Sequence, residues 1–120
     1  MKTLTENTLF KNLTASFDRS PDQINSVLQS DSELIKLANG VVLAITTDCI
    51  VEEIETGLYD DPYMIGWMTV TVNLSDISAV GARPLGLLLQ ENLPYNYPDD
   101  KLQLLQKGIS DGCKAHKTFV

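Results

Sequence analysis

The sequence predicts an α+β domain with a ferredoxin-like mixed sheet and helices on one face of that sheet. Segments with helical and extended patterns alternate in the order helix, helix, strand, strand, helix, strand, helix, strand. Val41–Ile45 is a nearly continuous run of apolar, mostly β-branched residues, which is typical of a strand buried on both faces. The stretch from Pro62 to Gly81 is apolar for roughly five helical turns and contains one charged residue, Asp76.

The pattern separates an N-terminal helical segment, residues 1–30, from a main domain, residues 31–120. Asn7 is suited to cap a first helix, and Ser20-Pro21-Asp22 has the residues of a second helix start. The first helix has an apolar stripe that packs either on this domain's own core or on another subunit or domain. The stripe consists of Leu9, Phe10, Leu13 and Phe17.

The main domain is expected to begin with a hairpin. Glu33–Leu37 is a short strand candidate, and Asn39-Gly40 is the strongest hairpin signal in the chain. The acidic stretch Val51–Asp61 is interpreted as a solvated loop, with a mobile loop over a ligand site as the alternative.

The central helix has clear ends. Asp60 or Asp61 can cap its first amides, Pro62 suits its first position, and Gly81 suits a left-handed terminus. Its predicted buried stripe is Trp67, Val70, Leu74 and Ile77. The carboxylate of Asp76 in so apolar a helix must be paired, protonated or bound to a cation, because burying it alone is costly.

The remaining segments predict a strand, a helix and a second strand. Leu85–Leu89 follows the helix-breaking Arg83-Pro84 and is interpreted as a buried strand. Asp99 and Asp100 begin a long helix whose last turn contains His116, expected to cap it or to lie at the surface. The buried stripe of this helix is predicted at Leu102, Leu105, Ile109 and Cys113, and residues 117–120 are expected to start another strand.

Composition restricts the class of protein. The 120 residues carry a net charge of −7, which argues against a broad basic surface for nucleic acid but not against a nucleotide bound through a divalent cation. No run approaches a membrane span and no signal-peptide core is present, so a cytoplasmic protein without membrane partners is expected. Cys49 and Cys113 belong to no metal-binding motif and are predicted to be buried thiols.

Three aspartates are candidate metal ligands because each stands at an element boundary or in an uncharged element: Asp31, Asp48 and Asp76. Converging carboxylates repel one another unless a cation joins them, and Mg²⁺ prefers such oxygen ligands. Asn73 lies one turn before Asp76 and could add a carbonyl oxygen. From the residues alone the other interpretation stays open, in which Asp48 caps a turn and Asp76 caps a short helix.

Two motifs of the chain resemble those of the AIR synthase-related ATP-binding superfamily, most of all its thiamine-monophosphate kinases. The first is Thr46-Thr47-Asp48, and the second is Asn73-Leu74-Ser75-Asp76 with the following Gly81-Ala82-Arg83-Pro84. The resemblance extends from Asp31 to the last residue. It implies the fold of that family's N-terminal domain and a homodimer formed through the sheet. The site residues it implies are Asp31, Asp48 and Asp76 for Mg²⁺, and Thr46, Thr47, Asn73 and Asp76 for ATP.

The chain also departs from the family pattern. Gln29–Glu33 stands where the family has Gly-Asp-Asp-Ala-Ala, so one metal position is weakened. Glu55 stands where the kinases have a substrate-site histidine, and its negative charge disfavours thiamine monophosphate as the substrate. Because the family continues past a strand like residues 117–120 into a further motif and a C-terminal domain, a truncated fragment without activity of its own is expected.

The sequence therefore predicts the Mg²⁺-dependent ATP-binding half of an enzyme that performs ATP-dependent phosphoryl transfer. The alternative is a non-catalytic dimerisation or regulatory module that retains the fold with a degraded nucleotide site. The small-molecule substrate, the phosphate acceptor and the catalytic base are not determined by the sequence.

Overall fold

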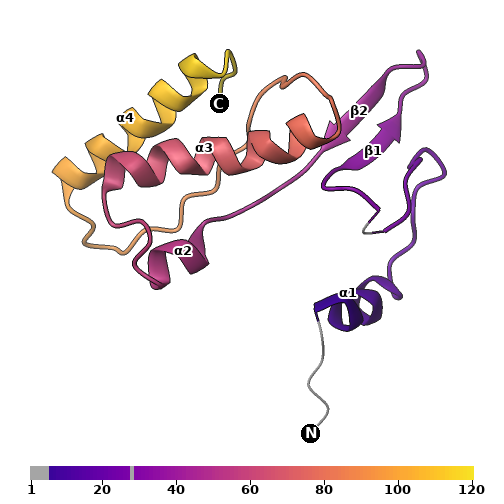
Figure 1. Cartoon of the computed structure of the whole chain (residues 1–120), viewed down its shortest axis with the longest axis horizontal. Coiled ribbons are helices and arrows are strands. Elements are labelled where there is room, and N and C mark those ends of the chain that lie inside the picture. Colours follow the sequence, from indigo (N-terminus) through magenta and orange to yellow (C-terminus); the bar gives the residue numbers. More distant parts are fainter. Residues whose placement is uncertain (1–5, 28) are drawn as a thin grey trace, which may run out of the picture. The chain divides into compact units, whose positions relative to one another are not determined.

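The computed structural model describes residues 6–27 and 29–120. Figure 1 shows their elements in chain order: α1 (Glu6–Thr14), β1 (Glu33–Lys36), β2 (Val42–Ile45), α2 (Val51–Glu55), α3 (Pro62–Ala79) and α4 (Asp99–Ala115). The chain divides into two compact units, with the boundary between Ile45 and Thr46. Helices and strands are both present, which confirms the mixed class that the sequence predicts.

The hairpin of the first unit forms as predicted. Strands β1 and β2 pair antiparallel, with Glu33 opposite Ile45 and Lys36 opposite Val42. Gly40 has a φ of 81°, a backbone conformation that favours glycine, and it makes the tight turn between the strands possible. The expected burial of β2 on both faces is wrong, because the side chains of Val42 and Ile45 are 48% and 47% exposed.

The second helix predicted from Ser20 does not form. Residues 20–27 make turns, and Gln23 pairs with Ile35 through an isolated bridge beside β1. Polar side chains compete for the backbone here: the side chain of Gln23 accepts from Ser20 N, and that of Asn25 accepts from Leu34 N. In α1, Asn7 is the second helical residue, and Leu9 and Phe10 are exposed.

The ends of α3 confirm the boundary signals of the sequence. Asp61 caps the helix by accepting a hydrogen bond from Met64 N at 3.2 Å, and Pro62 occupies the first turn. Gly81, just past the end, has a φ of 69°. A short helix, α2, forms within the acidic stretch that was predicted to be a loop, with Ile50 buried at its start.

The core of the second unit lies between α3 and α4. Its buried apolar side chains come from both helices, and Ile65, Leu87 and Leu89 pack against them. This confirms most of the two predicted stripes, although Trp67, Ile77 and Leu102 are only half-buried. The buried members are Val70, Leu74, Leu105, Ile109 and Cys113.

Glycines bring the backbones of α3 and α4 into direct contact. A Cβ added at Gly66 would overlap the carbonyl oxygen of Leu105, and one added at Gly108 would overlap the carbonyl oxygen of Tyr63. Farther along, a Cβ at Gly112 would lie 3.3 Å from Cβ of Val70. These contacts advance in the same direction along both helices, so α3 and α4 run parallel (Figure 1).

A parallel pair requires a connection that returns along the whole length of α3, whose 18 residues span about 27 Å. Residues 82–94 make this return without regular strand pairing. The predicted strands at 85–89 and 117–120 are therefore wrong as ladder strands, although Leu87 N donates to Phe119 O at 2.8 Å. In the described part of the chain β1 and β2 form the single sheet, and no described helix has the length and apolar character needed to cross a bilayer.

We expect Gly108→Ala to destabilise the second unit by about 1–3 kcal/mol, the usual cost of overpacking. The clash with the backbone of α3 outweighs the roughly 1 kcal/mol that alanine gains over glycine in a helix. Thermal unfolding would measure the loss, with Gln103→Ala on the exposed face of α4 as the control. Equal melting temperatures for the two variants would contradict the close crossing.

Leu74→Ala is expected to lower the free energy of unfolding by roughly 2–5 kcal/mol, because it leaves a cavity in the core. Leu74 is 6% exposed, whereas Leu104 on α4 is 44% exposed. Leu104→Ala removes the same atoms, so it serves as the matched control in urea unfolding and should cost less than half as much. Similar losses for both would show that the stripe of α3 is not the core.

Candidate functional site

Residues 46–48, which follow β2, are joined to the C-terminal half of α3 by side-chain hydrogen bonds. Thr46 Oγ1 donates to Asp76 Oδ2 at 2.7 Å, across 30 residues of sequence. Asp48 N donates to Asn73 Oδ1 at 2.9 Å. Asn73 and Asp76 lie one helical turn apart on one face of α3, so this face holds the segment at two points.

Asn73 makes two contacts with the same residue of the segment. Besides accepting from Asp48 N, it donates from Nδ2 to Asp48 O at 3.2 Å. Its Nδ2 also donates to Thr69 O at 2.9 Å, one turn earlier in α3. A side-chain amide has two N–H donors, so both are used by protein groups.

The two carboxylates of the site differ in their surroundings. Asp76 is half-buried and accepts the Thr46 hydroxyl hydrogen bond, so the lone charge of α3 has a polar partner, as its cost of burial requires. Asp48 is exposed, and its Oδ1 accepts from Cys49 N at 2.7 Å. Both carboxylates belong to the junction of residues 46–48 with α3.

Two further predicted site residues are Thr47 and Asp31. Thr47 is exposed and lies between the two residues that bond to α3. Asp31 is exposed and belongs to the first unit, whereas the junction belongs to the second. Asp31 therefore stays a predicted ligand.

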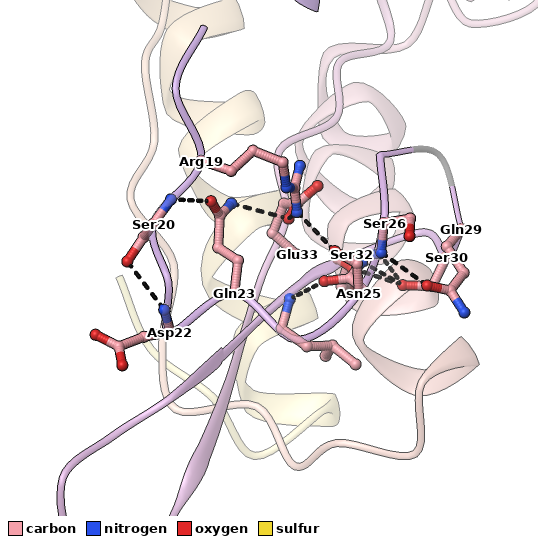
Figure 2. A network of polar contacts seen from close by, with 11 residues as sticks. Arg19, Ser20, Asp22, Gln23, Asn25, Ser26, Gln29, Ser30, Ser32 and Glu33 are labelled. Atoms are coloured by element: carbon pink, nitrogen blue, oxygen red, sulfur yellow. Dashed lines mark hydrogen bonds and ion pairs between the residues drawn. The ribbon is translucent and has the colours of Figure 1, made fainter.

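The neighbours of Asp31 are engaged in a polar network of the first unit (Figure 2). Asn25 is buried and donates from Nδ2 to Ser32 O at 3.0 Å, while Arg19 bonds to Glu33 Oε2 at 2.8 Å. Gln29 Oε1 accepts from Ser26 N at 2.7 Å. Several polar groups of this stretch are thus engaged in hydrogen bonds within the first unit.

The donor set of the junction fits a magnesium ion bound with a phosphate ligand. Magnesium is commonly held by one or two carboxylates, with waters and phosphate oxygens completing its shell. Asp48 and Asp76 supply two carboxylates, and no cluster of three or more potential metal-binding side chains occurs among the residues that the structure describes. A cation here would therefore depend on its phosphate ligand.

A second charged cluster lies on the face of α4 that meets the start of α3. Asp111 accepts hydrogen bonds from Lys107 and from Tyr63, and Lys107 Nζ lies 5.2 Å from the Tyr63 ring centroid. The hydrogen bond and charge of Lys107 lower the pKa of Asp111, and Asp111 raises the pKa of Lys107 in return. Sequence patterns missed this cluster because Tyr63 and Asp111 are 48 residues apart.

The two cysteines differ from each other. Cys113 is buried as predicted, and burial raises the pKa of its thiol. It lines an open cavity of about 370 Å³ with Ile109 and Phe119. Cys49 is exposed, so its predicted burial is wrong. His116 is the C-terminal cap residue of α4, as expected, and its ring lies 6.3 Å from that of Trp67.

Comparison with known proteins gives several related sequences. The thiamine-monophosphate kinase of Pyrococcus abyssi is 33% identical over 90 residues, 75% of this chain and 29% of the relative. In Methanocaldococcus jannaschii, the thiamine-monophosphate kinase is 31% identical over 98 residues, 81% of this chain and 31% of the relative. Selenide, water dikinase of that organism is 31% identical over 113 residues, 93% of this chain and 31% of the relative. The chain thus spans about three tenths of the length of these relatives, and no solved structure gives a significant match.

A family model matches a range that includes the whole junction between residues 46–48 and α3. This model describes the AIR synthase related protein, N-terminal domain, and it matches residues 29–120. The match covers most of the chain and both motifs that meet in the structure. The chain belongs to the AIR synthase related protein family, with residues 29–120 corresponding to its N-terminal domain.

Proposed function

We propose that this chain is the ATP-binding part of an AIR synthase-related enzyme that performs phosphoryl transfer with Mg²⁺. The observation that carries the proposal is the hydrogen-bonded junction of residues 46–48 with α3, which holds Asp48 and Asp76 at one place in the second unit. Two carboxylates of this kind suit a cation that bridges them to nucleotide phosphates. Relatives named as kinases and a dikinase support this class of reaction.

Individual residues have distinct parts in this proposal. Asp48 and Asp76 would hold the cation, which neutralises phosphate charge, and Thr46 and Thr47 would contact the ATP. Asp31 is proposed as a further metal ligand on the family resemblance alone. Glu55 is exposed beyond Asp48 on α2, and its charge disfavours a phosphorylated acceptor such as thiamine monophosphate.

The polar network around Asp31 supports a second candidate function. Gln29, Ser30, Ser32 and Glu33 make hydrogen bonds within the first unit, so this stretch is built for local structure. A non-catalytic dimerisation or regulatory module would retain the fold with such a reduced site. Binding of MgATP distinguishes this candidate from the first.

We also propose that the domain pairs with a second copy through its extended segments, which would complete the ferredoxin-like sheet. Val42 and Ile45 of β2 are about half exposed, and Leu85 and Leu88 of the return segment are 68% and 102% exposed. Soluble monomers rarely leave such apolar segments uncovered, and a twofold partner would cover them. The expected location of this acidic protein is the cytoplasm.

We expect Asp48→Ala and Asp76→Ala each to weaken binding of MgATP at least tenfold, about 1.4 kcal/mol. Isothermal titration calorimetry on the protein at its full natural length would measure the affinity. Glu91→Ala removes the same charge from an exposed loop and is the matched control. Equal affinities for the wild type and both aspartate variants would rule out the proposed site.

Light scattering at micromolar concentration should give the mass of two chains, since each has a mass of 13.3 kDa. Leu88→Glu should shift the protein to the monomer, because it places a charge in the proposed interface. Gln90→Glu adds the same charge to an exposed residue of the same segment and should leave the dimer intact. A wild-type mass near that of one chain would refute the dimer.

A further inference from the structure

We propose that Asn73 is a positioning residue, whose side-chain amide fixes the backbone of Asp48 and thereby aims the Asp48 carboxylate at a bound cation. The family resemblance implies that Asn73 contacts ATP. Its hydrogen bonds assign it a different part, because they are made to the backbone of the residue that carries the carboxylate. This inference rests on the proposed nucleotide-binding function.

The two contacts restrain both sides of Asp48. Asn73 Oδ1 accepts from Asp48 N at 2.9 Å, and Asn73 Nδ2 donates to Asp48 O at 3.2 Å. The N–H belongs to the peptide group before Asp48, and the carbonyl belongs to the peptide group after it. Holding both planar groups restricts φ and ψ of Asp48, the two soft dihedrals of its backbone. The direction of its side chain from the backbone is then set.

Asn73 is itself held by the helix. Its Nδ2 donates to Thr69 O at 2.9 Å, and the next residue, Leu74, is buried in the core between α3 and α4. The amide therefore transmits the position of a packed helix to a segment that has no regular secondary structure. Since both of its N–H groups are used within the protein, Asn73 has no donor left for a phosphate.

The side-chain chemistry is specific to asparagine. A carboxylate could accept from Asp48 N but could not donate to Asp48 O, and glutamine would move the amide by one methylene group. Without the amide, the backbone of the exposed Asp48 would become ordered only when the cation binds. The conformational entropy lost in fixing one residue then weakens binding by about tenfold.

The test compares Asn73→Ala with Thr71→Ala in the protein at its full natural length. Thr71 Oγ1 donates to Trp67 O at 3.0 Å, so it makes the same kind of bond one turn back along α3. The described hydrogen bond of the Thr71 side chain stays within α3, and Thr71 is half-buried like Asn73, which makes it a matched control for effects on the helix alone. Asn73→Gln replaces Asn73→Ala if the alanine variant does not fold.

Two readouts are needed. Hydrogen exchange of the Asp48 amide without ligand reports the backbone contact. Asp48 is exposed, and its N–H is protected by the hydrogen bond to Asn73 Oδ1. We expect exchange about tenfold faster in Asn73→Ala than in the wild type, and no change in Thr71→Ala. Calorimetry with MgATP should give about tenfold weaker binding for Asn73→Ala alone.

The outcomes separate this inference from the proposed function. An Asp48 amide that exchanges freely in the wild type overturns the inference, whatever the nucleotide does. Normal MgATP binding by Asn73→Ala, when Asp48→Ala has lost it, also overturns the inference but leaves the proposed function standing. If the wild type itself does not bind MgATP, the proposed function fails and the inference fails with it.

Discussion

Helices α3 and α4 touch backbone to backbone because Gly66 and Gly108 have no side chains at their crossing. A single methyl group at either position would meet a carbonyl oxygen of the opposite helix. The close approach lets Val70 and Ile109 fill the space that remains, so the core of the second unit consists of a few well-buried side chains. The position of each segment that is bonded to α3 therefore depends on this contact.

The candidate site is the clearest example of that dependence. Residues 46–48 have no ladder or helix of their own, and their place is given by Asn73 and Asp76 on α3. The same face of one helix therefore supplies a carboxylate and the amide that orders a second carboxylate. Binding residues are commonly found on such irregular segments, held in place by a regular element such as α3.

The sequence predicted those features that are encoded by neighbouring residues. The ends of α3 follow from Asp61, Pro62 and Gly81, and the hairpin follows from Asn39-Gly40. The motifs around Asp48 and Asp76 identified the two segments that meet, although not the bonds that join them.

The missed features depend on partners far away in the chain. Asn73 was predicted as a ligand from its motif, whereas its amide holds a backbone segment 25 residues earlier in the chain. The helix expected at Ser20 does not form, because polar side chains make hydrogen bonds with the backbone there. The spacing of apolar residues in a sequence does not predict such bonds. Leu85–Leu89 has the composition of a strand, but a strand also needs a partner, and the described chain supplies one backbone hydrogen bond there, from Leu87 to Phe119.

The parallel direction of α3 and α4 affects how the second unit folds. An antiparallel pair can zip together from a tight turn, whereas these helices meet only when residues 42 positions apart, Gly66 and Gly108 (108 − 66 = 42), reach the same crossing. Until then α3 presents its apolar stripe to solvent with Asp76 as its one charged residue. Partly folded chains in that state would associate through such stripes. The net charge of −7 then has a kinetic benefit, because repulsion between chains protects them while the loop closes.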